Sequence, residues 1–216
     1  MQARVLQDIT KFIANGKQAG AVYGLKGSAG SYIIASSIKK GSGPIIKVEI
    51  DSDSAAKTAR DIGFFLGLEE NSYSTIRSQI CHYPATMTQP YSFAAFETDV
   101  WINRAAAMFK LTESLPPRVL TISLDSLLRK VIPKKSFNSN ILNLSVGQEL
   151  EREYILEALT DAGFRRSPLV EDVGDFSVRG YLIDLFSPLY VNPIRIEQTG
   201  DIIESIRFFD PVSQRS

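Results

Sequence analysis

A glycine-rich stretch near the amino terminus contains the residue types of a phosphate-binding loop. Gly24, Gly27 and Gly30 precede Ser31, and the stretch begins at the end of an apolar run that predicts a buried strand over residues 19–25. A strand, a glycine loop and a helix form the setting in which backbone N–H groups bind phosphates. A working loop, G-x-x-x-x-G-K-[ST], also needs a lysine that reaches the β- and γ-phosphates, and Gly30 occupies that position here. We therefore predict a degenerate loop with a structural role and without nucleotide hydrolysis.

A second group of functional residue types lies in the other half of the chain, where arginines and an aromatic residue come close together in sequence. Arg165 and Arg179 each have a planar guanidinium that donates paired hydrogen bonds to carboxylates. Arginine and aromatic residues also dominate the energetics of protein interfaces, so these two residues and Phe186 favour a docking surface for another protein. The alternative is internal: ion pairs of Arg179 with Asp175 or Asp184, and Phe186 in the core.

The chain offers few residues for metal binding or covalent catalysis. Cys81 and His82 are the single cysteine and the single histidine, so we expect no disulfide, no multi-cysteine metal site and no Ser-His-Asp triad. Asp51 and Asp53 follow an apolar strand, where a dinucleotide-binding enzyme places its ribose carboxylate, but the first loop lacks the required glycine pattern. Capping of the next helix is the favoured interpretation. We expect no catalysis and no cofactor in this chain.

The elements that would position the glycine loop alternate between helices and apolar strands. Hydrophobic spacing predicts an amphipathic helix over residues 5–13 and further helices after each strand. Four strands that alternate with helices predict a parallel α/β sheet in residues 1–133. The expected strands are residues 19–25, 44–50, 80–83 and 118–123.

Two stretches of the first half could contact nucleic acid or could have only a structural role. The aromatic residues of the loop 84–96 could stack on bases, but the loop contains no basic residue, which favours packing against a helix. Lys130, Lys134 and Lys135 could touch phosphates, or they are solvated charge at a junction.

The second half has the pattern of a smaller α+β unit with mostly antiparallel strands. A strand is expected over residues 141–144, and Ser145 and Gln148 have the spacing of a capping box that opens a helix. Gly163 is expected to end this helix in a left-handed conformation. The further expected strands are residues 176–179, 181–186, 193–198 and 202–208, the last two joined as a hairpin at Gly200.

Length and charge support two domains. The chain has 216 residues, 44% hydrophobic and 22% charged, which is enough for one large domain or two small ones. Residues 1–133 contain 15 Lys and Arg against 11 Asp and Glu, whereas residues 134–216 contain 9 against 13. This change from a net charge of +4 to −4 favours a boundary near Pro133. No apolar run approaches the roughly eighteen residues of a membrane span and no signal peptide is visible, so we expect a cytoplasmic location without membrane contact.

The motifs of the second half resemble the amino-terminal UvrB-like module of the bacterial transcription-repair coupling factors (Mfd). In that family the patterns G-[YF]-x-R, G-[DE]-[FY]-x-x-R-G, D-[LV]-F and G-D-x-[IL]-[ED]-S-[IL]-R-x-F-D follow one another in this order. The resemblance extends over the whole chain and is specific from about residue 140 onward. The corresponding segments are Gly163-Phe164-Arg165, Gly174 to Gly180, Asp184-Leu185-Phe186 and Gly200 to Asp210.

The resemblance implies a domain organisation. Residues 1–133 would form a degenerate P-loop-type domain similar to UvrB domain 1a, in agreement with the missing lysine, which UvrB itself keeps. Residues 134–209 would form a UvrA-binding-type domain similar to UvrB domain 2, and residues 210–216 would begin a truncated domain 1b. The tyrosine-rich hairpin with which UvrB holds damaged DNA has no room in this chain.

The resemblance also implies a partner. The matching domain docks UvrA, the damage-recognition ATPase of nucleotide excision repair, and the matching positions Arg165, Arg179 and Phe186 would make that contact. The chain would then be a non-catalytic fragment of an ATP-dependent DNA translocase that displaces stalled RNA polymerase. ATP and Mg²⁺, RNA polymerase and DNA would be bound by other domains of the parent. The alternatives are an ATP- and DNA-binding UvrB-like helicase fragment, or a module that only anchors other domains of its parent.

Overall fold

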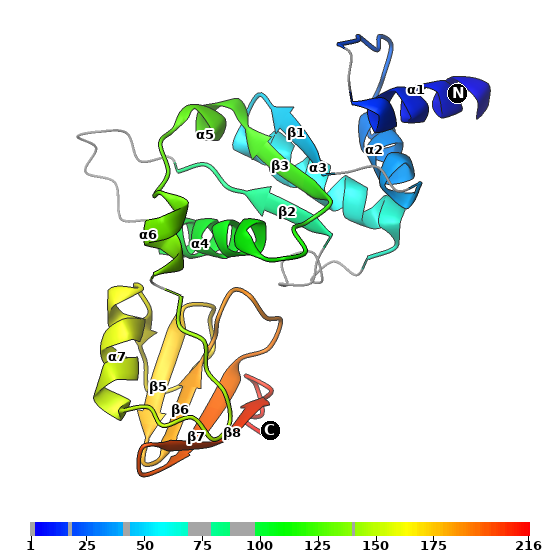
Figure 1. Cartoon of the computed structure of the whole chain (residues 1–216). Helices are drawn as coiled ribbons and strands as arrows, with labels where there is room; N and C mark the ends of the chain where they lie inside the picture. The colour runs from blue at the N-terminus through cyan, green and yellow to red at the C-terminus, as the bar shows by residue number, and fades with distance from the viewer. Residues whose placement is uncertain (1–2, 17–18, 41–43, 69–78, 87–97, 140) are drawn as a thin grey trace. The chain divides into compact units, whose positions relative to one another are not determined.

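The protein is described by a computed structural model that covers residues 3–16, 19–40, 44–68, 79–86, 98–139 and 141–216. The chain forms two compact units, Met1–Ala94 with Asn103–Arg129 and Ala95–Ile102 with Lys130–Ser216 (Figure 1). The first contains a parallel sheet with helices and the second a mostly antiparallel sheet, which confirms the predicted α/β and α+β classes. The family-derived boundaries stay predictions. No helix in the described ranges is long and apolar enough to span a membrane.

The sheet of the first unit has three parallel strands in the order β1-β3-β2. Strand β3, Val119–Ser123, is central, and Val119 has Ile45 of one neighbour and Ile80 of the other as its register partners. The neighbours are β1, Ile45–Glu49, and β2, Ile80–Tyr83. Along β1 exposed side chains alternate with half-buried ones, and Ile46 and Val48 lie on the exposed side, so its prediction as a buried strand is only partly correct.

The fourth expected strand does not form. Residues 19–25 are exposed and pair with no strand, so the prediction of a buried strand before the glycine loop is wrong. An apolar run becomes a strand only when its backbone groups find hydrogen-bond partners. Gly24 also has a φ of 78°, in the left-handed region that extended strands do not use. The glycine loop therefore follows an irregular segment.

The helices of the first unit pack around this sheet. The contact between α2 and α3 places Ile34, Ile38 and Ile62 in one buried cluster with Ile80 and Val119. The Oδ1 atom of Asp51 accepts a hydrogen bond from the Ser54 N–H at 2.7 Å, which confirms the predicted helix cap. The helices are α1 (Ala3–Asn15), α2 (Ala29–Lys39), α3 (Ser52–Leu66), α5 (Leu124–Leu128) and α4 (Thr98–Thr112), which belongs to this unit from Asn103 onward.

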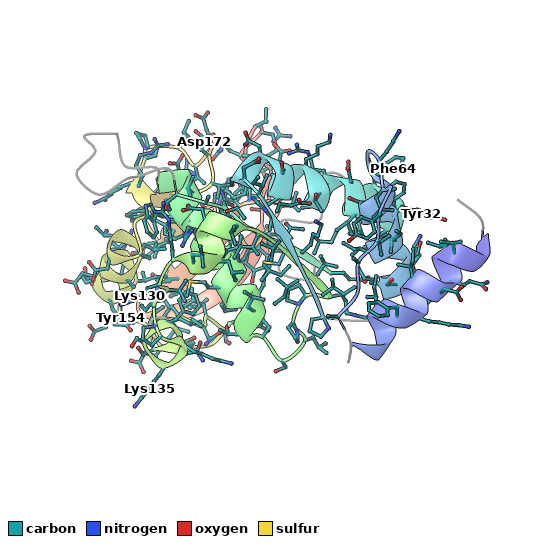
Figure 2. All side chains as sticks on the ribbon, turned by 90° about the horizontal axis from the view of Figure 1, so that it is seen from above. Tyr32, Phe64, Lys130, Lys135, Tyr154 and Asp172 are labelled. Atoms are coloured by element: carbon teal, nitrogen blue, oxygen red, sulfur yellow. The ribbon has the colours of Figure 1, made fainter. Side chains whose placement is uncertain are left out.

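The loop of aromatic residues cannot be placed, because its residues 87–97 lie outside the described ranges. The lysines after it can be placed. Lys134 and Lys135 begin α6, Lys134–Asn138, a short helix that the sequence patterns do not predict and that has no buried residue. Figure 2 shows the Lys135 side chain extending away from α6, in line with solvated charge.

The sheet of the second unit has five strands in the order β4-β5-β6-β7-β8. β4 and β5 are parallel and all other neighbours are antiparallel. Helix α7, Arg152–Asp161, covers one face of this sheet (Figure 1), and its Ile155 and Leu159 enter the same buried cluster as Ile183 and Ile196. The strands are β4 (Arg165–Arg166), β5 (Asp175–Arg179), β6 (Leu182–Leu185), β7 (Ile194–Thr199) and β8 (Ile202–Phe208).

The start of α7 differs from the prediction, and its end agrees. Residues 141–144 form no strand. Gln148 Oε1 does accept the Ser145 N–H at 3.0 Å, but this pair closes a turn, and the helix begins only at Arg152. At the other end, Gly163 has a φ of 86°, and the N–H of Phe164 donates a hydrogen bond to the carbonyl of Leu159 at 2.9 Å. This Schellman motif confirms the predicted end of the helix.

Candidate protein-docking face

The sheet of the second unit has one apolar and one polar face. Its apolar residues pair across the strands, Phe176 with Leu185 and Ile183 with Ile196, and pack under α7. Side chains alternate between the two faces of a strand. The residues in the alternate positions form a polar row, in which Ser177 is opposite Asp184, Asp184 opposite Arg195 and Arg195 opposite Arg207. We call the side away from α7 the polar face.

All three predicted interface residues belong to this face. Arg165 is the register partner of Asp175, two positions before Ser177 on β5, and Arg179 is two positions after Ser177. Phe186 follows Asp184 by two positions and donates its N–H to the Asp175 carbonyl at 2.9 Å. Strand alternation therefore gathers residues that are 21 positions apart in sequence on one side of the sheet.

Arg165 is an exposed guanidinium held by a buried carboxylate. Its Nη2 and Nε lie 2.8 Å and 3.0 Å from Oδ1 of Asp175. The Arg165 side chain is 69% exposed and that of Asp175 only 4%. Asp172, on the loop before β5 (Figure 2), lies 3.8 Å from Arg165 and donates its N–H to Asp175 Oδ2 at 3.2 Å. Asp175 thus fixes the direction of a charge that stays in contact with solvent.

Asp184 is the buried centre of the face, with a side chain that is 1% exposed. Its Oδ1 accepts Arg195 Nε at 2.7 Å, and its Oδ2 accepts Arg195 Nη2 at 3.0 Å and Arg179 Nη2 at 2.6 Å. The two parallel bonds from Arg195 are the strong fork geometry of an arginine and a carboxylate. The hydrogen bonds to Asp184 raise the pKa of Arg195 further above its ordinary value.

The two arginines on Asp184 differ in how much hydrogen-bonding capacity they retain. Arg195 is 13% exposed, lies 4.5 Å over the ring of Phe209, and bonds through Nε, Nη1 and Nη2. Arg179 is 43% exposed and bonds through Nη2, whereas its Nε and Nη1 have no hydrogen-bond partner in the described part of the chain. Arg179 can therefore still donate to a carboxylate of another molecule.

Phe186 differs from the two arginines because its side chain is buried. It is buried in a small cluster with Val170 and Phe209. The internal alternative therefore holds for the packing of Phe186 and for the ion pair of Arg179 with Asp184. A direct contact of Phe186 with a partner stays a prediction.

Three residues of the face were not predicted as site residues. Arg195 has a recognisable signal, because it alternates with Ile194 and Ile196 and so faces away from the core. Phe209 is the F of the R-x-F-D pattern, which does not reveal its contact with Arg195. Gln214 has no local signal, since its position depends on how the chain folds back after β8.

The glycine loop keeps some of the backbone form of a phosphate-binding loop. Gly24 and Gly27 have φ values of 78° and 54°, while Gly30 and Ser31 lie in the first turn of α2, and Ser31 is buried. Ser28 caps this helix without a side-chain hydrogen bond. The loop offers backbone groups and no lysine at the phosphate position.

The thiol of Cys81 and the imidazole of His82 are largely shielded from solvent. Burial raises the pKa of the Cys81 thiol to about 11 and lowers the pKa of His82 below its ordinary value. His82 Nδ1 lies 3.1 Å from Thr121 Oγ1. In the described ranges, no three His, Cys, Asp or Glu side chains come together in a way that could hold a metal ion.

Comparisons with known proteins find related sequences. Residues 142–216 match the family described as the UvrB interaction domain. The chain is 38% identical over 193 residues, 89% of its length, to a transcription-repair-coupling factor of Myxococcus xanthus. It is 26% identical over 192 residues to that of Escherichia coli K12, and 27% identical over 213 residues, 97% of its length, to that of Bacillus subtilis 168.

The match covers only part of these relatives. The chain spans 16–17% of their length. Over about nine-tenths of its own length the chain is therefore homologous to the transcription-repair-coupling factors, and its residues 142–216 match the UvrB interaction domain family.

Proposed function

We propose that the polar face is a docking surface for UvrA, and that the chain recruits UvrA as a non-catalytic module of a transcription-repair-coupling factor. The observation that supports this most is the pair Arg165 and Arg179. Both are exposed on one face of the sheet, and each is held by a carboxylate that is at most 4% exposed.

Pre-positioned arginines are suited to recognition for a thermodynamic reason. A free arginine side chain has about 2 kcal/mol of rotamer entropy, part of which is lost when a partner fixes it. Here Asp175 and Asp184 have already restricted the two side chains. The partner surface that fits them presents carboxylates, because a guanidinium donates paired hydrogen bonds to that group.

The first unit serves as a structural support in this proposal and binds no nucleotide. The absence of the loop lysine and the irregular segment before Gly24 support that view. We also propose that ATP, Mg²⁺, DNA and RNA polymerase are bound by other parts of the parent protein. Titration of a fluorescent ATP analogue tests the first statement, since micromolar binding by this chain would favour the helicase-like alternative.

The direct test is calorimetric titration of purified UvrA into the chain, with Arg179→Ala and Arg207→Ala variants shown to be folded by circular dichroism. We expect Arg179→Ala to raise the Kd by about thirtyfold or more, since hot-spot arginines contribute roughly 2 kcal/mol. Arg207 is the matched control, because it lies on the same face in an exposed pair with Glu197. Its removal should change the Kd less than about threefold.

Two outcomes contradict the proposal. Because the description of the matched domain names UvrB, UvrB is titrated in parallel, and binding of UvrB without binding of UvrA would reassign the partner. Failure of both to bind would favour the anchoring role, with the arginines acting as internal ion pairs.

A further inference from the structure

The segment after β8 folds back to the two arginines on Asp184. Gln214 Oε1 lies 3.5 Å from Arg179 Nη2, and the Gln214 backbone carbonyl accepts Arg195 Nη1 at 3.2 Å. One residue therefore contacts both guanidinium groups, one through its side chain and the other through its backbone.

Gln214 is itself firmly placed. Its Nε2 donates to the carbonyls of Pro211 at 2.7 Å and Val170 at 3.4 Å, and its N–H donates to the Asp210 carbonyl at 2.8 Å. Asp210 Oδ1 closes the same turn by accepting the N–H groups of Val212 at 2.9 Å and Ser213 at 2.6 Å. Among the described residues, Gln214 is the one non-glycine residue with a positive φ, 60°. The turn imposes this conformation, which non-glycine residues rarely adopt.

Arg195 limits how Arg179 can bind Asp184. The fork of Arg195 occupies Oδ1 and shares Oδ2, so Arg179 reaches the carboxylate through Nη2 only. Without Arg195, both carboxylate oxygens would be open to a second fork, and Arg179 could turn inward and use Nε as well. Such a turn would withdraw the N–H groups that now lack an internal partner.

We propose that Arg195 and Gln214 are positioning residues for Arg179, and that they keep its Nε and Nη1 directed outward for docking. This inference rests on the proposed function, in which Arg179 contacts UvrA. Arg195 restricts Arg179 to one bond with Asp184, and Gln214 gives the bonded Nη2 a second acceptor. Neither residue needs to touch the partner.

A double-mutant cycle on UvrA affinity separates positioning from a general structural role. Gln214→Gly keeps the left-handed backbone and removes the side chain, whereas Arg195→Lys keeps the charge and removes the fork. We expect each to raise the Kd about three- to tenfold in the wild-type background and less than about twofold in an Arg179→Ala background, because coupled residues are not additive. Arg215→Ala is the control in the same turn, and it should not change the Kd.

Equal losses in both backgrounds would overturn the inference, because the two residues would then act independently of Arg179. Gln214→Gly keeps the test valid if Arg195→Lys does not fold. A second measurement does not depend on UvrA: ¹⁵N NMR of the Arg179 Nε–H group and of rotation about its guanidinium bonds. We expect faster rotation in Gln214→Gly than in the wild-type chain.

The UvrA titration and the NMR comparison distinguish the proposed function from the positioning role of Arg195 and Gln214. A wild-type chain that does not bind UvrA contradicts the proposed function, and the NMR comparison then decides the positioning role by itself. Unchanged guanidinium rotation in Gln214→Gly would overturn that role even if UvrA binds.

Discussion

The glycine loop of the first unit and the polar face of the second unit are both candidate sites, but they differ in the side chains that they present. The loop keeps left-handed glycines and a following helix, yet Gly30 stands where a lysine would be needed. On the polar face, Arg165 and Arg179 are each held by a buried carboxylate. A backbone frame without its charged side chain binds phosphate weakly, whereas fixed side chains retain their specificity. The two candidate sites therefore differ in the charged side chains that they present.

Removal of Asp184 should have the largest effect on stability. This variant tests whether buried carboxylates hold the arginines of the polar face in place. Asp184→Ala leaves the largely buried Arg195 without its carboxylate partner. We expect the free energy of unfolding of the second unit to fall by about 3–5 kcal/mol in urea titrations. Glu197→Ala is the control, since its pair with Arg207 is exposed, and it should cost at most about 1 kcal/mol. Equal stability of the two variants would show that Asp184 is dispensable.

A change at Gly163 tests whether the end of α7 positions the residues that lead into Arg165. Gly163 has a φ of 86°, which an alanine adopts only at a cost of about 1–2 kcal/mol. We expect Gly163→Ala to lower the thermal midpoint and Gly163→Asn to lower it less, because asparagine tolerates this conformation. If alanine and asparagine were equally tolerated, the left-handed cap would not be required.

The stability of the first unit should depend on pH through the burial of His82. In the second unit, by contrast, the buried carboxylates Asp175 and Asp184 are paired with arginines. Desolvation lowers the pKa of His82 in the folded state below 6.5. The unfolded chain therefore binds the proton more readily, and stability falls as the pH decreases from 6.5 to the folded pKa. The loss is at most about 1.4 kcal/mol for each pH unit. His82→Gln should remove this component from urea titrations between pH 5 and 8, and an unchanged profile would assign it to other groups.

Restoring the lysine of the loop should have the smallest effect. If the missing lysine were the only defect, Gly30→Lys would create an ATP site. We expect no binding of a fluorescent ATP analogue, because residues 19–25 form no strand that would hold the loop in place. Micromolar binding by this variant, with none by the wild-type chain, would show that the backbone frame is intact and would weaken the contrast with the polar face.

Features that depend on neighbouring residues could be predicted from the sequence. The caps at Asp51 and Gly163 and the hairpin at Gly200 have local causes, namely a side-chain acceptor or a positive φ. Hydrophobic periodicity likewise predicted α/β structure in the first half of the chain and α+β structure in the second half. The sequence by itself also made Arg165 and Arg179 candidates, because arginine and aromatic residues dominate the energetics of protein interfaces.

The tertiary structure decided what depends on distant partners. Residues 19–25 are apolar, but a strand needs a neighbour to pair with, and none is present in the described sheet. Phe186 is aromatic and close to the arginines, but Val170 and Phe209 bury it. The distinction between Arg179 and Arg195 is likewise absent from the sequence, because both are arginines on neighbouring parts of one sheet. It follows from how Asp184 divides its two oxygens between them and from the fold of the chain after β8.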